Sequence, residues 1–128
     1  HRSPTETDLP SRGSAPHLLV TLTGHGFGHA AQACVVVRAL RERLPALRLT
    51  ICATLRRPVL AELFGEPFEL VNEPPDPGGL VMTSPFDVDV EASADAYAAF
   101  HANWDARVRH DARALAELAP DALLADVP

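Results

Sequence analysis

The sequence lacks an apolar stretch long enough to cross a membrane as a helix, which takes roughly 18 residues, since all its apolar runs are shorter. It also has few basic residues, with 11 Lys and Arg against 17 Asp and Glu and a formal net charge of −6. No basic stripe marks it as a nucleic-acid-binding protein, and the acidic balance disfavours anionic lipid. We therefore expect no transmembrane segment and no nucleic-acid partner.

Cysteine is scarce too. Cys34 and Cys52 are the only two, too few for a disulfide framework or a cysteine metal cluster. Both stand in apolar surroundings, Cys34 in an expected helix and Cys52 in an expected strand, which favours small buried side chains. The N-terminus lacks the basic segment and following apolar run of a signal peptide. Together these features favour a cytoplasmic location.

What is present is a globular composition. Hydrophobic residues make up 47 % of the 128 residues, which suits one domain with a core and is too short for two. Residues 1–16 are polar, rich in proline and without apolar periodicity, so we expect a flexible leader there. The folded domain is expected to span residues 17–128.

Strand-like and helix-like segments alternate along this domain. Short apolar runs at residues 17–23, 48–53, 68–71 and 121–128 predict buried strands. Helices are predicted from near residue 30 to Pro45, over residues 58–64, and as one long helix over residues 91–120. This order predicts an α/β fold, a three-layer Rossmann-like parallel sheet flanked by helices. Residues 72–92, rich in proline and glycine, are predicted to form a functional or mobile loop.

The two longer helices each carry an apolar stripe that we expect to be buried. On the first helix the stripe is Ala30, Ala33, Cys34, Val37, Leu40 and Leu44. On the long helix it is Tyr97, Phe100, Trp104, Val108, Ala112 and Leu115, with Trp104 as a core anchor. Asp105 and Arg109 are expected to form an exposed i,i+4 ion pair, and His101 and His110 to be structural or solvated.

The segment TGHGFGHA, residues 23–30, connects the first strand to the first helix. Its glycines, Gly24, Gly26 and Gly28, let a ligand or another backbone approach closely. The N-terminus of the following helix suits an anionic or polyol ligand. Ligands of open α/β sheets bind at the carboxyl ends of the strands, where this turn and Asp126 are both expected.

Several kinds of site can be compared with this pattern. The G-x-G-x-G spacing, with no acid in ICATLRR at the second strand, argues against a dinucleotide site, and no Gly-Lys pair exists for a P-loop. A metal site at His25 and His29 would need a distant third ligand. Two interpretations of His29 stay open. It caps the helix or fills the turn, or it is an acid–base residue oriented by Asp126. The structural alternative for Asp126 is a helix cap.

The segments TGHGFGHAAQACVVVRALRERLP and PDALLADVP resemble nucleotide-sugar glycosyltransferases of GT-B architecture. The resemblance covers most of residues 16–128 and is strongest to the glycosyltransferase-like family that includes the N-terminal part of L-arabinokinases. It implies a partial N-terminal, acceptor-side domain of a GT-B fold. Two departures stand out, because the family's Thr-Arg after the second histidine is Ala31-Gln32 here and its Ser before the aspartate is Ala125.

The resemblance also implies a reaction. A sugar would move from a nucleotide-diphosphate donor, UDP-linked, to a hydroxyl of a small-molecule or glycan acceptor with inversion, without a metal or other cofactor. His29 would be the general base and Asp126 its orienting partner. The substrate-binding residues would be Gly24, His25, Gly26, Phe27 and Gly28. A missing C-terminal domain would hold the donor, so the isolated chain is expected to be inactive. The alternative is a non-catalytic sugar-nucleotide-binding or regulatory module attached to a sugar kinase.

Overall fold

The computed structural model of the chain describes residues 15–24, 27–74 and 79–125. Its strands are β1 (His17–Thr21), β2 (Arg48–Cys52), β3 (Glu69–Val71), β4 (Met82–Ser84), β5 (Asp87–Val88) and β6 (Ala122–Ala125). Its helices are α2 (Gly28–Arg43), α3 (Arg57–Phe64), α4 (Val90–His101) and α5 (Trp104–Leu118). The predicted α/β class and the first three predicted strands and two helices are confirmed.

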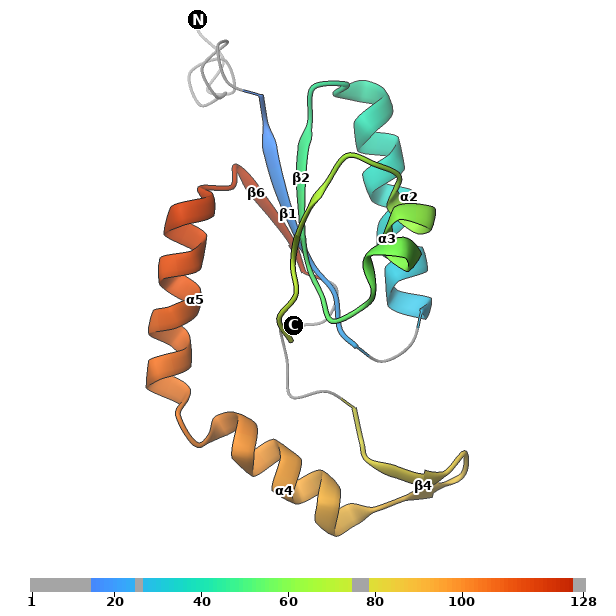
Figure 1. Cartoon of the computed structure of the whole chain (residues 1–128), viewed down its shortest axis with the longest axis vertical. Coiled ribbons are helices and arrows are strands. Elements are labelled where there is room, and N and C mark those ends of the chain that lie inside the picture. The colour runs from blue at the N-terminus through green and yellow to red at the C-terminus, as the bar shows by residue number, and fades with distance from the viewer. Residues whose placement is uncertain (1–14, 25–26, 75–78, 126–128) are drawn as a thin grey trace, which may run out of the picture.

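The main sheet is parallel and has the strand order β3-β2-β1-β6. β1 lies in its interior, with Thr21 opposite Cys52 on one side and opposite Ala125 on the other. Helices α2 and α3 lie on one face of this sheet and α5 lies on the other (Figure 1). The chain runs outward from β1 through β2 to β3, whereas β6 lies on the opposite side of β1. The gap between β1 and β6 is therefore a topological switch point, beside which α/β sheets bind ligands.

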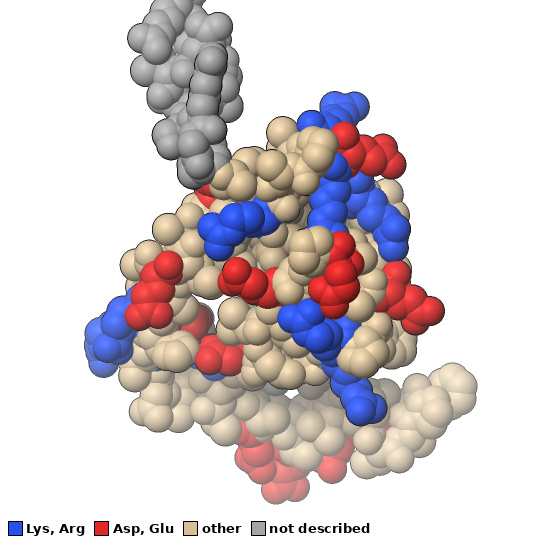
Figure 2. Space-filling view, turned by 45° about the horizontal axis from the view of Figure 1, so that its top comes forward, with Lys and Arg blue, Asp and Glu red and all other residues tan. Residues whose placement is uncertain are grey.

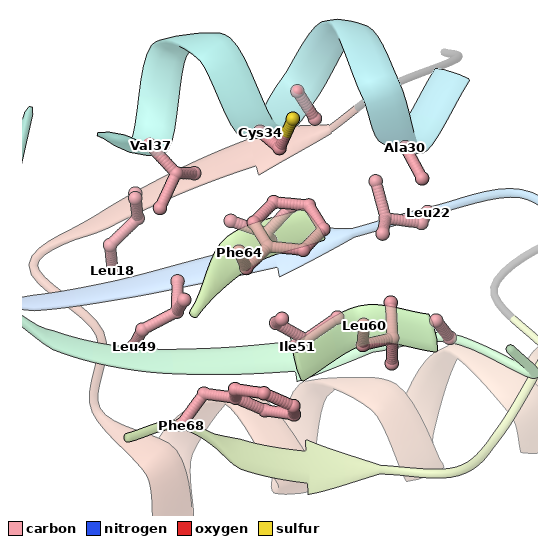
Figure 3. Close-up of a cluster of buried hydrophobic side chains, with 13 residues drawn as sticks. Leu18, Leu22, Ala30, Cys34, Val37, Leu49, Ile51, Leu60, Phe64 and Phe68 are labelled. Atoms are coloured by element: carbon pink, nitrogen blue, oxygen red, sulfur yellow. The ribbon is translucent and has the colours of Figure 1, made fainter. Parts of the chain in front are cut away.

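The core lies between the sheet and the pair α2 and α3. Side chains alternate between the two faces of a strand, so Leu18 and Val20 point to this core. Figure 3 shows Phe64 among side chains from α2 and the sheet. The predicted stripe of α2 is mostly confirmed, because Ala30, Ala33, Cys34 and Val37 are buried. Leu44 is a correction: it follows the last helical residue as the C-cap and is 43 % exposed.

The predicted long helix over residues 91–120 is wrong, because the chain forms two helices with a break at Ala102 and Asn103. Asn103 has φ −121° and ψ 47°, outside the helical region, and it stands at the N-cap of α5. Asparagine favours caps over helix interiors because its side chain competes for backbone hydrogen bonds. The break lets α5 return along the sheet while α4 extends beyond it (Figure 1).

The stripe predicted on that helix is also wrong. Apart from the half-buried Phe100, its residues are exposed, and Trp104 is not a core anchor at 51 % exposure. Trp104 instead stacks on His101, with ring centroids 5.2 Å apart. The side of α5 that faces the sheet carries Arg107, Asp111, Ala114, Leu115 and Leu118. The helix is thus rotated about its axis relative to the prediction, and its ion pair joins Arg107 and Asp111 at 3.9 Å instead of Asp105 and Arg109.

The segment predicted as a loop, residues 72–92, contains a hairpin that the sequence did not reveal. β4 and β5 pair antiparallel with a register irregularity, and Phe86 at their turn is 94 % exposed. The carboxylate of Asp89 then caps α4 by accepting a hydrogen bond from the Ala92 N–H at 2.9 Å. A short, irregular strand pair has too few alternating residues to give a clear period-2 pattern.

The surface in Figure 2 carries Arg side chains interspersed with Asp and Glu, and no single sign of charge dominates it. Exposed ion pairs include Arg57 with Glu66 at 2.9 Å and Arg48 with Glu69 at 3.6 Å. Within the described part of the chain, no helix has the length and apolar character needed to cross a membrane.

Candidate functional site

The candidate site is the turn that connects β1 to α2 at the carboxyl edge of the sheet. Pairing continues one residue past β1, because the Leu22 N–H donates to the Cys52 carbonyl at 2.9 Å. Leu22 and Thr23 are buried, and the chain reaches the surface at Gly24. Because Thr21 lies opposite Ala125, β1 and β6 end together at this edge, beside the switch point.

The structure describes four of the seven predicted site residues. Gly24, Phe27, Gly28 and His29 are described, whereas His25, Gly26 and Asp126 lie outside the described residues. His29 is the second residue of α2 and is half-buried, and Phe27 is 60 % exposed at the N-cap. His29 therefore lies at the predicted edge of the sheet, and its pairing with Asp126 stays a prediction.

The N-cap residue of α2 makes no side-chain cap. Phe27 stands at the N-cap position and provides no capping oxygen, and the first turn contains no acidic residue. The first N–H groups of a helix have no acceptor within the helix, and the helix dipole places partial positive charge there. Because the first turn contributes no carboxylate of its own, an anion or a sugar hydroxyl is favoured at this position.

Thr23 adds a feature that sequence reasoning missed. Its residue is 3 % exposed, and its Oγ1 is buried without a hydrogen-bond partner among the residues that the structure describes. An unsatisfied buried hydroxyl costs about 1–3 kcal/mol, so such groups in native proteins usually meet a ligand or water. The sequence signal was a hydroxyl residue at the end of a buried strand, directly before the glycines.

The two described glycines of the turn differ in what a side chain at each position would contact. A Cβ at Gly24 would lie 2.9 Å from Oγ1 of Thr54, whereas a Cβ at Gly28 would meet nothing within 4 Å. Gly24 therefore lets the turn approach the segment that follows β2. Gly28 has no such packing reason among the described residues, and its side of the turn is open to solvent.

These glycines give a testable contrast in stability. Gly24→Ala is expected to lower the free energy of unfolding by about 1 kcal/mol, because Thr54 must move. Gly28→Ala is expected to leave it unchanged or raise it by up to about 1 kcal/mol, because alanine favours the helical conformation. Urea denaturation followed by circular dichroism measures both. Equal destabilisation by the two substitutions would contradict the assignment of open space at Gly28.

A second polar group lies at the same edge, toward α5, and no sequence pattern predicted it. Cys52 at the end of β2 donates its S–H to the Glu73 carbonyl at 3.6 Å, and the Glu73 carboxylate lies 3.2 Å from Nε2 of His110. Burial raises the pKa of the Cys52 thiol, Glu73 and Asp111 raise it further, and Arg107 lowers it. These residues come from β2, the segment after β3, and α5, so only folding brings them together.

The two cysteines therefore differ. Cys34 is buried and donates its S–H to the Ala31 carbonyl at 3.0 Å, which confirms the prediction of a small buried side chain. Cys52 is only half-buried, which corrects the prediction, because its side of the sheet faces the gap under α5.

Among the described residues, Glu73, His110 and Asp111 bring their ligand atoms within 4.8 Å of one another. A histidine nitrogen and two carboxylate oxygens are ligands that zinc accepts. All three side chains are exposed, however, and acidic groups on a surface gather in this way without a metal. We assign no metal to them.

Comparison of the chain with protein-family models, curated proteins and solved structures found no match in any of the three.

Proposed function

We propose that this chain is the acceptor-side part of a GT-B glycosyltransferase that moves a sugar from a nucleotide-diphosphate donor to a hydroxyl acceptor. The observation that carries the proposal is the buried Thr23 hydroxyl, which has no partner among the described residues and stands directly before the glycine turn. The uncapped N-terminus of α2 and the open space at Gly28 support it. Hydrogen-bonding need, partial positive charge and room for a ligand together suit a sugar or its phosphate.

In the proposed reaction His29 takes the proton from the acceptor hydroxyl. The acceptor oxygen forms a bond to the anomeric carbon as the bond from that carbon to the diphosphate oxygen breaks, with inversion. Asp126 would hold the imidazole in the tautomer that accepts the proton and balance the charge that develops on it. The position of His29 in the first turn of α2 would place this proton transfer next to the site that favours the anionic leaving group.

The alternative is a module that binds a sugar nucleotide without catalysis. The features of the site favour this alternative. A buried hydroxyl and a helix N-terminus bind ligands, and open space accommodates them, but none of these features breaks bonds. Under this alternative a neighbouring sugar kinase would carry the chemistry.

Titration of the ¹⁵N-labelled 128-residue chain with UDP-glucose tests the binding that both functions require. The amides of Thr23, Gly24, Gly28 and His29 are expected to shift and to saturate at millimolar ligand. Thr23→Val is expected to weaken binding about fivefold to tenfold, because it removes one hydrogen bond to the ligand. The same substitution should leave the free chain as stable or more stable, because it removes an unsatisfied polar group.

Glucose and UDP alone serve as control ligands and show which half of the donor is recognised. His29→Gln separates the two functions when it is made in the longer protein that the proposal implies, because it should keep binding in both and abolish transfer only in an enzyme. Unchanged amides throughout the turn, or equal affinity for the Thr23→Val chain, would refute the proposed site.

A further inference from the structure

A cavity of about 190 Å³ lies between α5 and the face of the sheet opposite the main core. The sheet lines it with Leu19, Val71 and Leu123, and α5 closes it with apolar residues around Ala114 and Leu118. A cavity of about 150 Å³ is sufficient to bind benzene. This cavity therefore has room for an apolar group about the size of a ring.

The cavity results from which residues α5 directs toward the sheet. Ala114 stands at the middle of that side, where a larger residue would fill the gap. The bulky Trp104 and Val108 are exposed at 51 % and 48 % and do not line the cavity. The rotation of α5 about its axis therefore creates the gap, because it places the small Ala114 over the sheet.

The open end of the cavity is charged. Glu73 and Asp111 line it with side chains 51 % and 52 % exposed, whereas Leu19 is 4 % exposed. The carboxylates therefore lie toward solvent together with Leu123, which is 52 % exposed, whereas Leu19 lies deeper. A ligand that matches this arrangement has an apolar body and a charged end.

The sign of that charge follows from how the groups are paired. The Arg107 guanidinium donates to the Pro74 carbonyl, lies 4.1 Å from the ring centre of Phe100 and is 3.9 Å from Asp111. It is already engaged, and it is one guanidinium against two carboxylates among the charged side chains that line the cavity, although Glu73 also pairs with Nε2 of His110 at 3.2 Å. The Cys52 thiol also lines the cavity. Burial is the largest cause that raises its pKa, Glu73 and Asp111 raise the pKa further, and Arg107 lowers it. At Cys52 the two carboxylates therefore outweigh the guanidinium of Arg107.

We propose that this cavity binds a small organic cation with an apolar body, a primary aryl- or alkylamine, with its ammonium group beside Glu73 and Asp111. The body would lie over Leu19 and under Ala114. The inference goes beyond the proposed function, because neither His29 nor the described glycines Gly24 and Gly28 line the cavity. An anionic nucleotide is disfavoured at this position by the same carboxylates.

Cys52 makes the proposal measurable, because a ligand in the cavity covers its thiol. The full chain is treated with methyl methanethiosulfonate, which is neutral and thiol-selective, and modification is followed by mass spectrometry. Equal concentrations of benzylamine, benzyl alcohol and benzoate are compared. Benzylamine is expected to bind about fivefold more tightly than benzyl alcohol, and benzoate more weakly still, since one net charge acts near the surface. Cys34, buried and hydrogen-bonded, is the internal control for unfolding.

Two sets of variants separate charge from shape. The double variant Glu73→Gln, Asp111→Asn should remove the preference for benzylamine over benzyl alcohol and keep the binding of the alcohol. Ala114→Phe should fill the cavity and abolish binding of all three probes, whereas Ala116→Phe, on the exposed side of α5, should not. Amide shifts of Cys52 and Leu123 report binding independently of thiol chemistry.

Protection in the order benzylamine, benzyl alcohol, benzoate supports the proposal. No protection by any probe, equal protection by benzoate, or full binding to the Ala114→Phe chain would overturn it. Binding of UDP-glucose followed at Thr23 is measured separately, so failure at the cavity and failure at the glycine turn can be told apart.

Discussion

Replacing Phe64 by alanine is expected to lower the free energy of unfolding by about 3–5 kcal/mol, a large part of the total stability of a domain this size. Phe64 is the last residue of α3 and is 1 % exposed, among the largest fully buried side chains. It packs in the cluster that joins α2, α3 and the sheet (Figure 3). Alanine would remove most of a ring's contacts from a cluster in which all three elements meet.

Urea denaturation followed by far-ultraviolet circular dichroism measures this loss. Phe86→Ala is the matched control, because it is the same substitution at a side chain that is 94 % exposed. The control is expected to change stability by less than about 0.5 kcal/mol. If Phe64→Ala were as stable as Phe86→Ala, the core described between α2, α3 and the sheet would be wrong.

His17→Ala is expected to lower the free energy of unfolding by about 2–3 kcal/mol. His17 is 3 % exposed, with its Nδ1 2.9 Å from the Leu118 carbonyl and its Nε2 2.7 Å from Oγ1 of Thr50. A carbonyl only accepts, so Nδ1 carries a proton, and in the neutral imidazole the Thr50 hydroxyl donates to Nε2. The imidazole thereby connects β1 with β2 and with the last residue of α5. Alanine would leave the Leu118 carbonyl and the buried Thr50 hydroxyl without these partners.

The matched control for this prediction is His110→Ala, because His110 lies on the surface of α5 and, among the described residues, pairs with exposed Glu73. An exposed pair contributes about 1 kcal/mol or less, so the control is expected to change little. Hydrogen exchange gives a second measurement. His17→Ala should speed exchange in residues 118–125, where α5 ends and β6 begins. Unchanged exchange there would show that the imidazole does not hold α5 and β6 in place.

Local sequence signals determined the order of β1, α2, β2, α3, β3 and β6 and most of their ends. The apolar run after Pro16 predicted β1, and the apolar period of 3.6 predicted the buried side of α2. Pro58 near the start of α3 and Gly65 at its C-cap, with φ 75°, marked that helix correctly because these two residues have strong backbone preferences. The parallel sheet followed from the alternation of strands and helices. Such features depend on residues close together in the chain, so the sequence alone is sufficient for them.

The tertiary structure decided what depends on distant residues. α5 has two candidate sides at helical spacing, and contact with the sheet selected the one with Ala114 over the one with Trp104. The break at Asn103 was recognised only in the tertiary structure, in which α5 packs back along the sheet. Likewise the unsatisfied Thr23 hydroxyl and the group around Cys52, Glu73 and Asp111 arise where the ends of separate strands meet a helix. Local pattern cannot specify these, because which side of a helix is buried and which polar groups meet are set by the surface that the rest of the fold presents.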